Sequence, residues 1–157
     1  MTESDLEKAL KLHRPAVYRL AMSYTGSSAD SEDITEEAFI KLYLRHKLPE
    51  DDSQTRAWLI RVTANLCKNH LKSPRHKNRA EMPENIPEET SISEEERQEL
   101  KAALESLKPD YRAVILLHYY EGFSAREIAS LLGLTVTAVT TRLQRGRESL
   151  KKFLTEN

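Results

Sequence analysis

Basic and amide side chains recur along the segment 56–72 with the spacing of one helical face. Four of them, at intervals of four, three and four residues, are Arg61, Asn65, Lys68 and Lys72. On a helix these intervals form one stripe, and Trp58 flanks it. Positive charge for a phosphate backbone, an amide for a base edge and a flat ring for stacking are the groups that single-stranded nucleic acid requires. A solvated charged face with Trp58 as a core anchor is the alternative, and this segment alone leaves both open.

A second constellation, over residues 124–147, has the layout of a helix-turn-helix. Ser124 with Glu127 three residues later is a capping box that opens a short helix. Gly133 then supplies a tight turn, and Thr135 can cap a longer helix. The polar face of that longer helix carries Thr137, Ala138, Thr141, Arg142, Arg145, Ser149 and Lys152. Arginine and threonine side chains on such a face suit DNA bases and phosphates, which favours DNA binding over a plain helical hairpin with a solvated face.

Carboxylates gather near the start of the segment 30–43. They are Glu32, Asp33, Glu36 and Glu37. A helical enzyme could use such groups, but a solvated helix start or a docking face explains them better. The chain has no Gly-rich phosphate loop and no His or Cys spacing typical of a metal site. Cys67, the only cysteine, lies among apolar neighbours and is interpreted as a buried thiol. We therefore expect no catalytic residue, no metal and no cofactor.

The charges of the chain are segregated, although the formal net charge is only -1. Residues 56–79 contain seven basic side chains and no acidic one, whereas residues 81–99 contain eight glutamates and one arginine. A basic block followed by an acidic block makes the net charge a poor guide to nucleic-acid binding. With 39% hydrophobic residues and four glycines, the chain can bury a core and favours helices.

Apolar periodicity predicts an all-α protein of two small helical domains joined by a flexible linker, the C-terminal domain being the helix-turn-helix. The first expected helix is 5–24, with Pro15 as a kink or restart. The second is capped by Asp30 or Ser31 and reaches residue 43, and the third starts at Ser53 or Thr55 and reaches residue 72. The C-terminal helices are expected at 94–106, 110–120, 124–132 and 135–154. The predicted domains are 1–73 and 94–157, and the acidic, proline-containing linker is 74–93.

The first residues lack the charged and then apolar layout of a secretion signal. No apolar run approaches the length that spans a membrane. We therefore expect a cytoplasmic protein that makes no membrane contact of its own.

Three motifs in this order resemble the extracytoplasmic-function sigma factors of the sigma-70 superfamily. Residues 30–43 (DSEDITEEAFIKLY) look like the family's helix for binding core RNA polymerase, and residues 56–69 (RAWLIRVTANLCKN) look like its helix for promoter melting and the minus-ten element. Residues 104–112 (LESLKPDYR) and 120–129 (YEGFSAREIA), continuing to Arg147, resemble its minus-thirty-five domain. The resemblance covers nearly the whole chain except the linker.

The resemblance implies roles for individual residues. The surface for core polymerase would comprise Asp33, Glu36, Glu37, Phe39 and Lys41. The minus-ten region would be contacted by Trp58, Arg61, Asn65, Lys68, Asn69 and Lys72. The minus-thirty-five element would be contacted by Arg126, Thr137, Thr141, Arg142 and Arg145.

The resemblance also implies a function without bond chemistry: binding core RNA polymerase and directing promoter recognition, DNA opening and transcription initiation. Its partners would be core RNA polymerase, promoter DNA and an anti-sigma protein. An autonomous helix-turn-helix regulator is the alternative. It shares the C-terminal half but leaves the acidic helix and the Trp-bearing basic helix unexplained.

Overall fold

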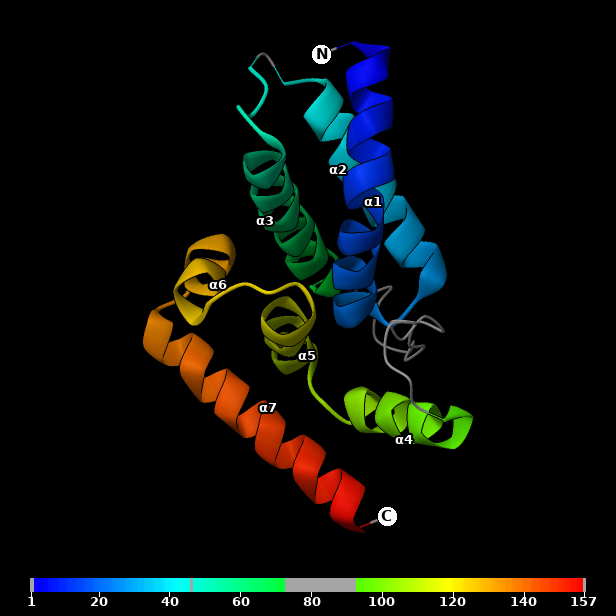
Figure 1. Ribbon diagram of the computed structural model, residues 1–157, viewed down its shortest axis with the longest axis vertical. Helices are drawn as coiled ribbons and strands as arrows, with labels where there is room; N and C mark the ends of the chain where they lie inside the picture. The colour runs from blue at the N-terminus through cyan, green and yellow to red at the C-terminus, as the bar shows by residue number, and fades with distance from the viewer. Residues whose placement is uncertain (1, 46, 73–92, 157) are drawn as a thin grey trace.

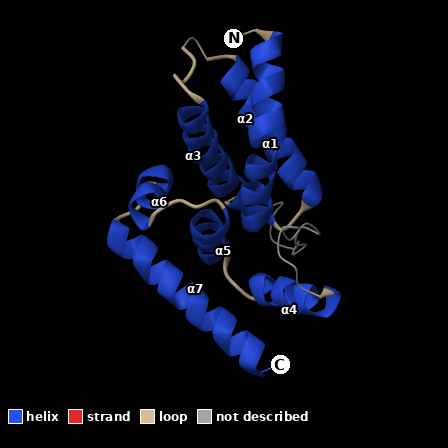
Figure 2. Cartoon of the chain, in the orientation of Figure 1, coloured by secondary structure: helices blue, strands red, loops and turns tan. Residues whose placement is uncertain are grey.

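A computed structural model of the 157-residue chain describes residues 2–45, 47–72 and 93–156. Within these ranges all regular secondary structure is helical, as Figures 1 and 2 show. The predicted all-α fold is confirmed. The predicted linker lies outside the described residues except for Ser93, which caps the helix that follows it.

The N-terminal half forms three helices that pack against one another: α1 (Glu3–Thr25), α2 (Ser28–Tyr43) and α3 (Asp52–Leu71). Pro15 lies inside α1, which is a single helix. Two predicted helix starts were wrong. Ser27 caps α2 by accepting from the backbone of Asp30, and Asp51 caps α3 by accepting from the backbone of Gln54. Both runs offer several good capping residues, and the earlier one begins the helix.

The C-terminal half contains α4 (Glu94–Glu105), α5 (Pro109–Ile115), η2 (Leu116–Tyr120), α6 (Ala125–Leu132) and α7 (Val136–Glu156). The predicted capping box is present, because Ser124 and Glu127 each accept the other's backbone N–H. Gly133 adopts a φ of 67°, the left-handed conformation that ends α6. The Thr135 hydroxyl accepts from the backbone of Ala138 at the start of α7. The helix-turn-helix is therefore formed as predicted.

A turn of π-helix, η2, continues α5 where a plain α-helix was expected. The backbone N–H of Glu121 donates to the carbonyl of Leu116, five residues earlier, at 3.0 Å. An α-helix closes this bond over four residues. The turn therefore holds one extra residue immediately before Glu121.

The two halves share one apolar core. α1 packs on α5, and α3 packs on α6 (Figure 1). Buried residues from both halves form a continuous cluster that includes Leu20 and Ile60 on one side and Leu117 and Leu132 on the other. The predicted buried thiol, Cys67, belongs to this cluster, and burial raises its pKa to about 12. The two helical units are thus in direct apolar contact.

A glycine brings α7 close to α5. A Cβ atom at Gly146 would stand 3.1 Å from two atoms of the Ile115 side chain. A side chain at position 146 would therefore have to push the Ile115 side chain aside by a few tenths of an ångström. No helix of the described ranges has the length and apolarity to cross a lipid bilayer.

Candidate nucleic-acid interface

Helix α3 separates its residues into a buried face and an exposed face. Leu59, Ile60, Thr63, Ala64 and Cys67 are buried. Four of the predicted DNA-contacting residues are exposed together on the other side: Arg61, Asn65, Asn69 and Lys72. We call these four residues the α3 strip. The structure thus gathers one guanidinium, one ammonium and two amides on a surface that a nucleic acid strand could follow.

Lys68, predicted with the strip, lies at its edge and turns toward the helix-turn-helix. Its Nζ donates to the backbone carbonyl of Leu132, the last residue of α6, at 2.9 Å. Burial lowers the pKa of Lys68, whereas the nearby Asp110 carboxylate raises it. In this arrangement Lys68 uses one of its three N–H donors for the protein, and its side chain stays half-exposed.

Trp58 contributes to packing in this structure. The indole is half-buried against the cluster that contains Val17, Phe39 and Leu59. The guanidinium of Arg45 lies over the ring at 4.7 Å from its centre. The ring is close to the α3 strip, but one of its faces is covered by Arg45.

The predicted residues of the helix-turn-helix differ in their exposure to solvent. Arg126, Thr137 and Arg145 are exposed, whereas Thr141 and Arg142 are half-buried. Burial chiefly lowers the pKa of Lys68 on α3, and the positive charge of Arg142 adds to this effect. Burial chiefly raises the pKa of Tyr24 on α1, and Arg142 opposes this effect, so Arg142 lies near the junction of the two halves.

The outer surface at the start of α7 also presents residues that the sequence prediction left out. Thr140 is exposed, and its hydroxyl donates to the carbonyl of Thr137 at 3.0 Å. Val136 is 44% exposed at the first position of α7. The exposed surface at the beginning of this helix is therefore formed by threonine and valine side chains, with Arg145 further along.

The acidic residues predicted for α2 are on the surface. Asp33, Glu36, Glu37 and Lys41 are exposed, and Phe39 is buried beneath them. A groove between α1 and α2 runs beside them, lined by Leu6, Leu10, Arg14, Glu32, Thr35, Glu36, Phe39, Ile40 and Tyr43. Ile40 and Tyr43 are 51% and 41% exposed, so the acidic surface borders an apolar one.

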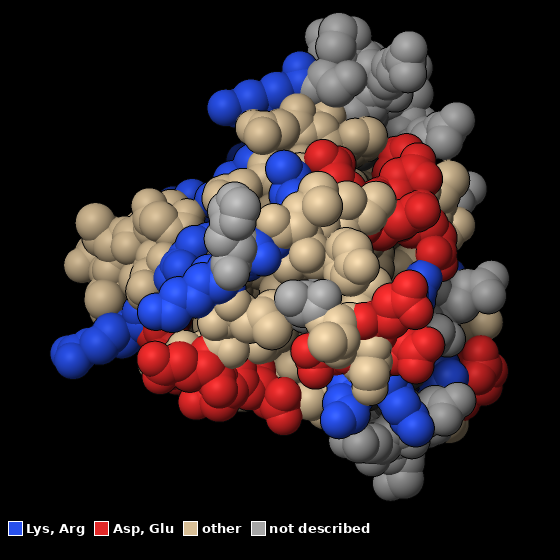
Figure 3. Space-filling view, turned by 90° about the horizontal axis from the view of Figure 1, so that it is seen from above, with Lys and Arg blue, Asp and Glu red and all other residues tan. Residues whose placement is uncertain are grey.

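Charged side chains of both signs cover the face seen from above in Figure 3. Lys and Arg side chains lie mainly on the left and again at the lower right, and Asp and Glu side chains lie along the right and at the lower left. Each sign therefore forms several local groups on this face, with no single boundary between them.

Comparison with known proteins matches both halves of the chain. Residues 10–77 match the family model for sigma-70 region 2, and residues 97–150 match the model for sigma-70 region 4. The ECF RNA polymerase sigma factor SigL of Mycobacterium tuberculosis is 30% identical over 163 residues, an alignment that covers 98% of this chain and 92% of SigL. The chain belongs to the extracytoplasmic-function (ECF) sigma factor family.

Other relatives agree with this assignment. The ECF sigma factor SigE of Mycolicibacterium smegmatis is 31% identical over 160 residues; the alignment covers 96% of this chain but only 62% of SigE. Among solved structures, the sigma factor RpoE of Bartonella quintana, crystallised with the anti-sigma factor NepR, has a TM-score of 0.75 at 23% identity. That match covers 96% of this chain and 97% of RpoE, and it shows a shared fold.

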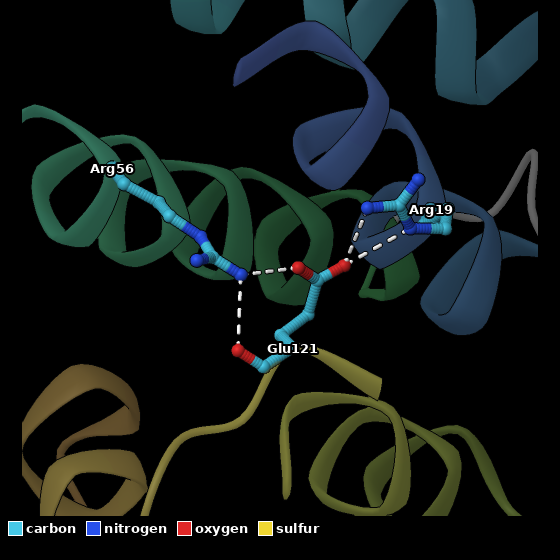
Figure 4. A network of polar contacts seen from close by, with 3 residues as sticks. All are labelled: Arg19, Arg56 and Glu121. Carbon is cyan, nitrogen blue, oxygen red and sulfur yellow. Dashed lines mark hydrogen bonds and ion pairs between the residues drawn. The ribbon is translucent and has the colours of Figure 1, made fainter. Parts of the chain in front are cut away.

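One polar cluster of this ECF sigma factor was not predicted from the sequence. Figure 4 shows Arg19 of α1 and Arg56 of α3 converging on Glu121, which directly follows η2. Both nitrogens of Arg19 that face Glu121 donate to Oε1, Nε at 3.0 Å and Nη2 at 2.8 Å. Arg56 Nη2 donates to Oε2 and also to the backbone carbonyl of Glu121, the latter at 3.1 Å. The cluster joins the region 2 helices to the region 4 helices.

Proposed function

We propose that this protein is a sigma subunit that binds core RNA polymerase and directs promoter recognition, DNA opening and transcription initiation. The observation that carries the proposal is the presence, in one chain, of an exposed basic and amide strip on α3 and a capped helix-turn-helix in α6 and α7. The first suits an opened strand and the second suits duplex DNA. The protein performs no bond chemistry in this role, and it works in the cytoplasm without membrane contact of its own.

The α2 surface is the proposed site for core polymerase. Its carboxylates Asp33, Glu36 and Glu37 are exposed beside an apolar groove. A charged rim around an apolar centre is the usual anatomy of a protein–protein interface. Phe39 supports this surface from below, and Lys41 lies on it.

DNA contacts are divided between the two halves in this proposal. The minus-ten region is contacted by the α3 strip with Trp58 and Lys68, and the minus-thirty-five element by Arg126, Thr137, Thr141, Arg142 and Arg145. The corresponding domains are 1–73 and 94–157, joined by 74–93. Linking two weak DNA-binding units raises their joint affinity through effective concentration. An anti-sigma protein is a further proposed partner, by analogy with the RpoE complex with NepR.

Co-elution with bacterial core RNA polymerase on a size-exclusion column tests the proposal. We expect the wild-type chain to co-elute and the Glu36→Lys/Glu37→Lys variant to lose co-elution, because two repulsive charges replace two exposed carboxylates. The matched control is Glu3→Lys/Glu7→Lys, the same charge change at exposed positions of α1 outside the groove. Loss of co-elution in both variants would refute the proposed α2 surface. If the wild type does not co-elute and the free chain binds duplex DNA tightly, the proposal is refuted and the autonomous regulator remains.

A further inference from the structure

The first residues of α7 carry neither a charge nor an amide. They are residues 136–141, with the sequence VTAVTT. In a helix-turn-helix, the N-terminal residues of the second helix are those that contact base edges. Arginine, lysine, asparagine and glutamine make the paired hydrogen bonds that identify guanine and adenine. The first of these residue types in α7 is Arg142, so the beginning of the helix offers bases only hydroxyl and methyl groups.

Two threonine hydroxyls at this end of the helix are already used by its backbone. Thr135 accepts from the N–H of Ala138, and Thr140 donates its hydroxyl to the carbonyl of Thr137, both at 3.0 Å. A hydroxyl has one proton to donate, so the donor of Thr140 is occupied and its γ-methyl group is left for contact. Val136 is 44% exposed and adds two methyl groups without any polar atom. Methyl groups are therefore the main feature of this surface.

The arginines of α7 lie beside this surface. Arg142 is half-buried, and Nη1 of Arg147 donates to the hydroxyl of Tyr119 in η2 at 2.8 Å. Arg145 is exposed, but it lies more than one turn beyond Thr140 and about 140° around the helix from it. Guanidiniums in these places suit the phosphates that flank the groove, and such contacts carry no sequence information.

Of the four bases, only thymine presents a methyl group in the major groove, at C5. We propose that α7 selects A·T pairs through apolar contact of Val136 and Thr140 with the C5-methyl groups of thymines, rather than through hydrogen bonds to guanine or adenine. These two residues then choose the base, while the arginines supply affinity that does not depend on sequence. The proposal rests on the proposed function only in requiring that α7 bind duplex DNA.

Selection from a pool of duplexes with a randomised stretch tests this preference. The full chain is used once with bacterial core RNA polymerase and once alone. We expect the selected site to contain A·T pairs, and each of its thymines is then replaced singly by deoxyuridine, which removes only the C5-methyl group. At one or two thymines the replacement should weaken binding by the wild type about fourfold, the effect of withholding one methyl group from apolar contact.

Variants that remove methyl groups from the protein assign those thymines to residues. Thr140→Ser keeps the hydroxyl, so deoxyuridine at the thymine that Thr140 contacts should cause little further loss of affinity. Val136→Ala should do the same at a second thymine. Thr155→Ser is the matched control, because Thr155 is exposed near the end of α7 and its hydroxyl also donates to a backbone carbonyl, that of Lys151, at 2.9 Å. It should behave as the wild type, and far-UV circular dichroism reports whether each variant is folded.

Several outcomes would overturn the proposal. They are selection of G·C pairs, equal binding of thymine and deoxyuridine duplexes by the wild type, and a deoxyuridine effect of the same size in the wild type, Thr140→Ser and Val136→Ala. Absence of duplex binding both with and without polymerase would overturn it as well. If the chain does not bind core polymerase but selects thymines alone, the proposed function fails and this inference stands, because an autonomous helix-turn-helix regulator also reads duplex DNA.

Discussion

Arg61→Gln should weaken single-stranded DNA binding in a salt-dependent manner that can be calculated in advance. Arg61 is an exposed cation of the α3 strip, so the substitution removes one charge available to a phosphate and leaves the buried face of α3 intact. Each phosphate that a cation neutralises contributes about 0.7 to the slope of log affinity against log salt concentration for single strands. The slope of the variant should therefore be smaller by about 0.7.

That change in slope has a direct consequence for the measured affinities. Between 50 and 200 mM salt, a difference of about 0.7 in slope reduces the affinity ratio of wild type to variant by about 2.6-fold. Fluorescence anisotropy with a 20-nucleotide labelled strand at four salt concentrations would measure both slopes. Lys11→Gln, which removes an exposed cation from α1, is the control and should behave as the wild type. An unchanged slope for Arg61→Gln, or an equal change in the control, would show that the strip does not contact the phosphate backbone.

Two further predictions concern the core. His13 is 4% exposed and its pKa is lowered, chiefly by burial and also by Arg56, against the opposing effect of Asp52. Below its ordinary pKa of about 6.5 the unfolded chain therefore binds a proton that the folded chain does not, and the free energy of unfolding should fall by up to about 1.4 kcal/mol per pH unit as the pH drops through this range. Urea unfolding at several pH values would measure this dependence. The free energy of unfolding of His13→Gln should change less with pH than that of the wild type, and an equal pH dependence in the two proteins would contradict the role given to His13. Gly146→Val should cost about 1–3 kcal/mol through overpacking against Ile115. Thermal unfolding would measure this cost, which should shrink in the Ile115→Ala background; a cost unaffected by residue 115 would place the strain elsewhere.

Local signals in the sequence predicted the helix-turn-helix well. Ser124, Glu127 and Gly133 act within a few residues of their own position, so capping chemistry and the left-handed turn could be recognised without knowledge of the fold. Periodicity likewise predicted that Arg61, Asn65 and Lys72 share one face of α3, which is exposed, whereas Asn69 of the α3 strip came from the family resemblance. Helix starts were less certain, because Ser27, Ser28, Asp30 and Ser31 are all capable caps and the first of them, Ser27, is the one that caps α2.

The contacts between the halves could not be predicted from local pattern. Arg19 and Glu121 are 102 residues apart, and their pairing depends on how α1 docks against η2. The sequence marks Arg56 only as one member of a basic block and Glu121 only as part of a motif. The half-buried position of Arg142 likewise depends on this docking, since a helical wheel places it with the other polar residues of α7.

The π-helical turn η2 makes the length of the chain, as well as its chemistry, a determinant of the contact at Glu121. One residue rotates an α-helix by about 100° around its axis. Because Glu121 bonds to a carbonyl five residues back, the extra residue in η2 sets the direction in which Glu121 leaves the helix. Deleting a single residue between 116 and 120 would restore the α-helical phase and turn the carboxylate away from both arginines. A one-residue difference in length at this point could therefore separate sigma factors that dock their halves through this acid from those that do not, even where the acid itself is retained.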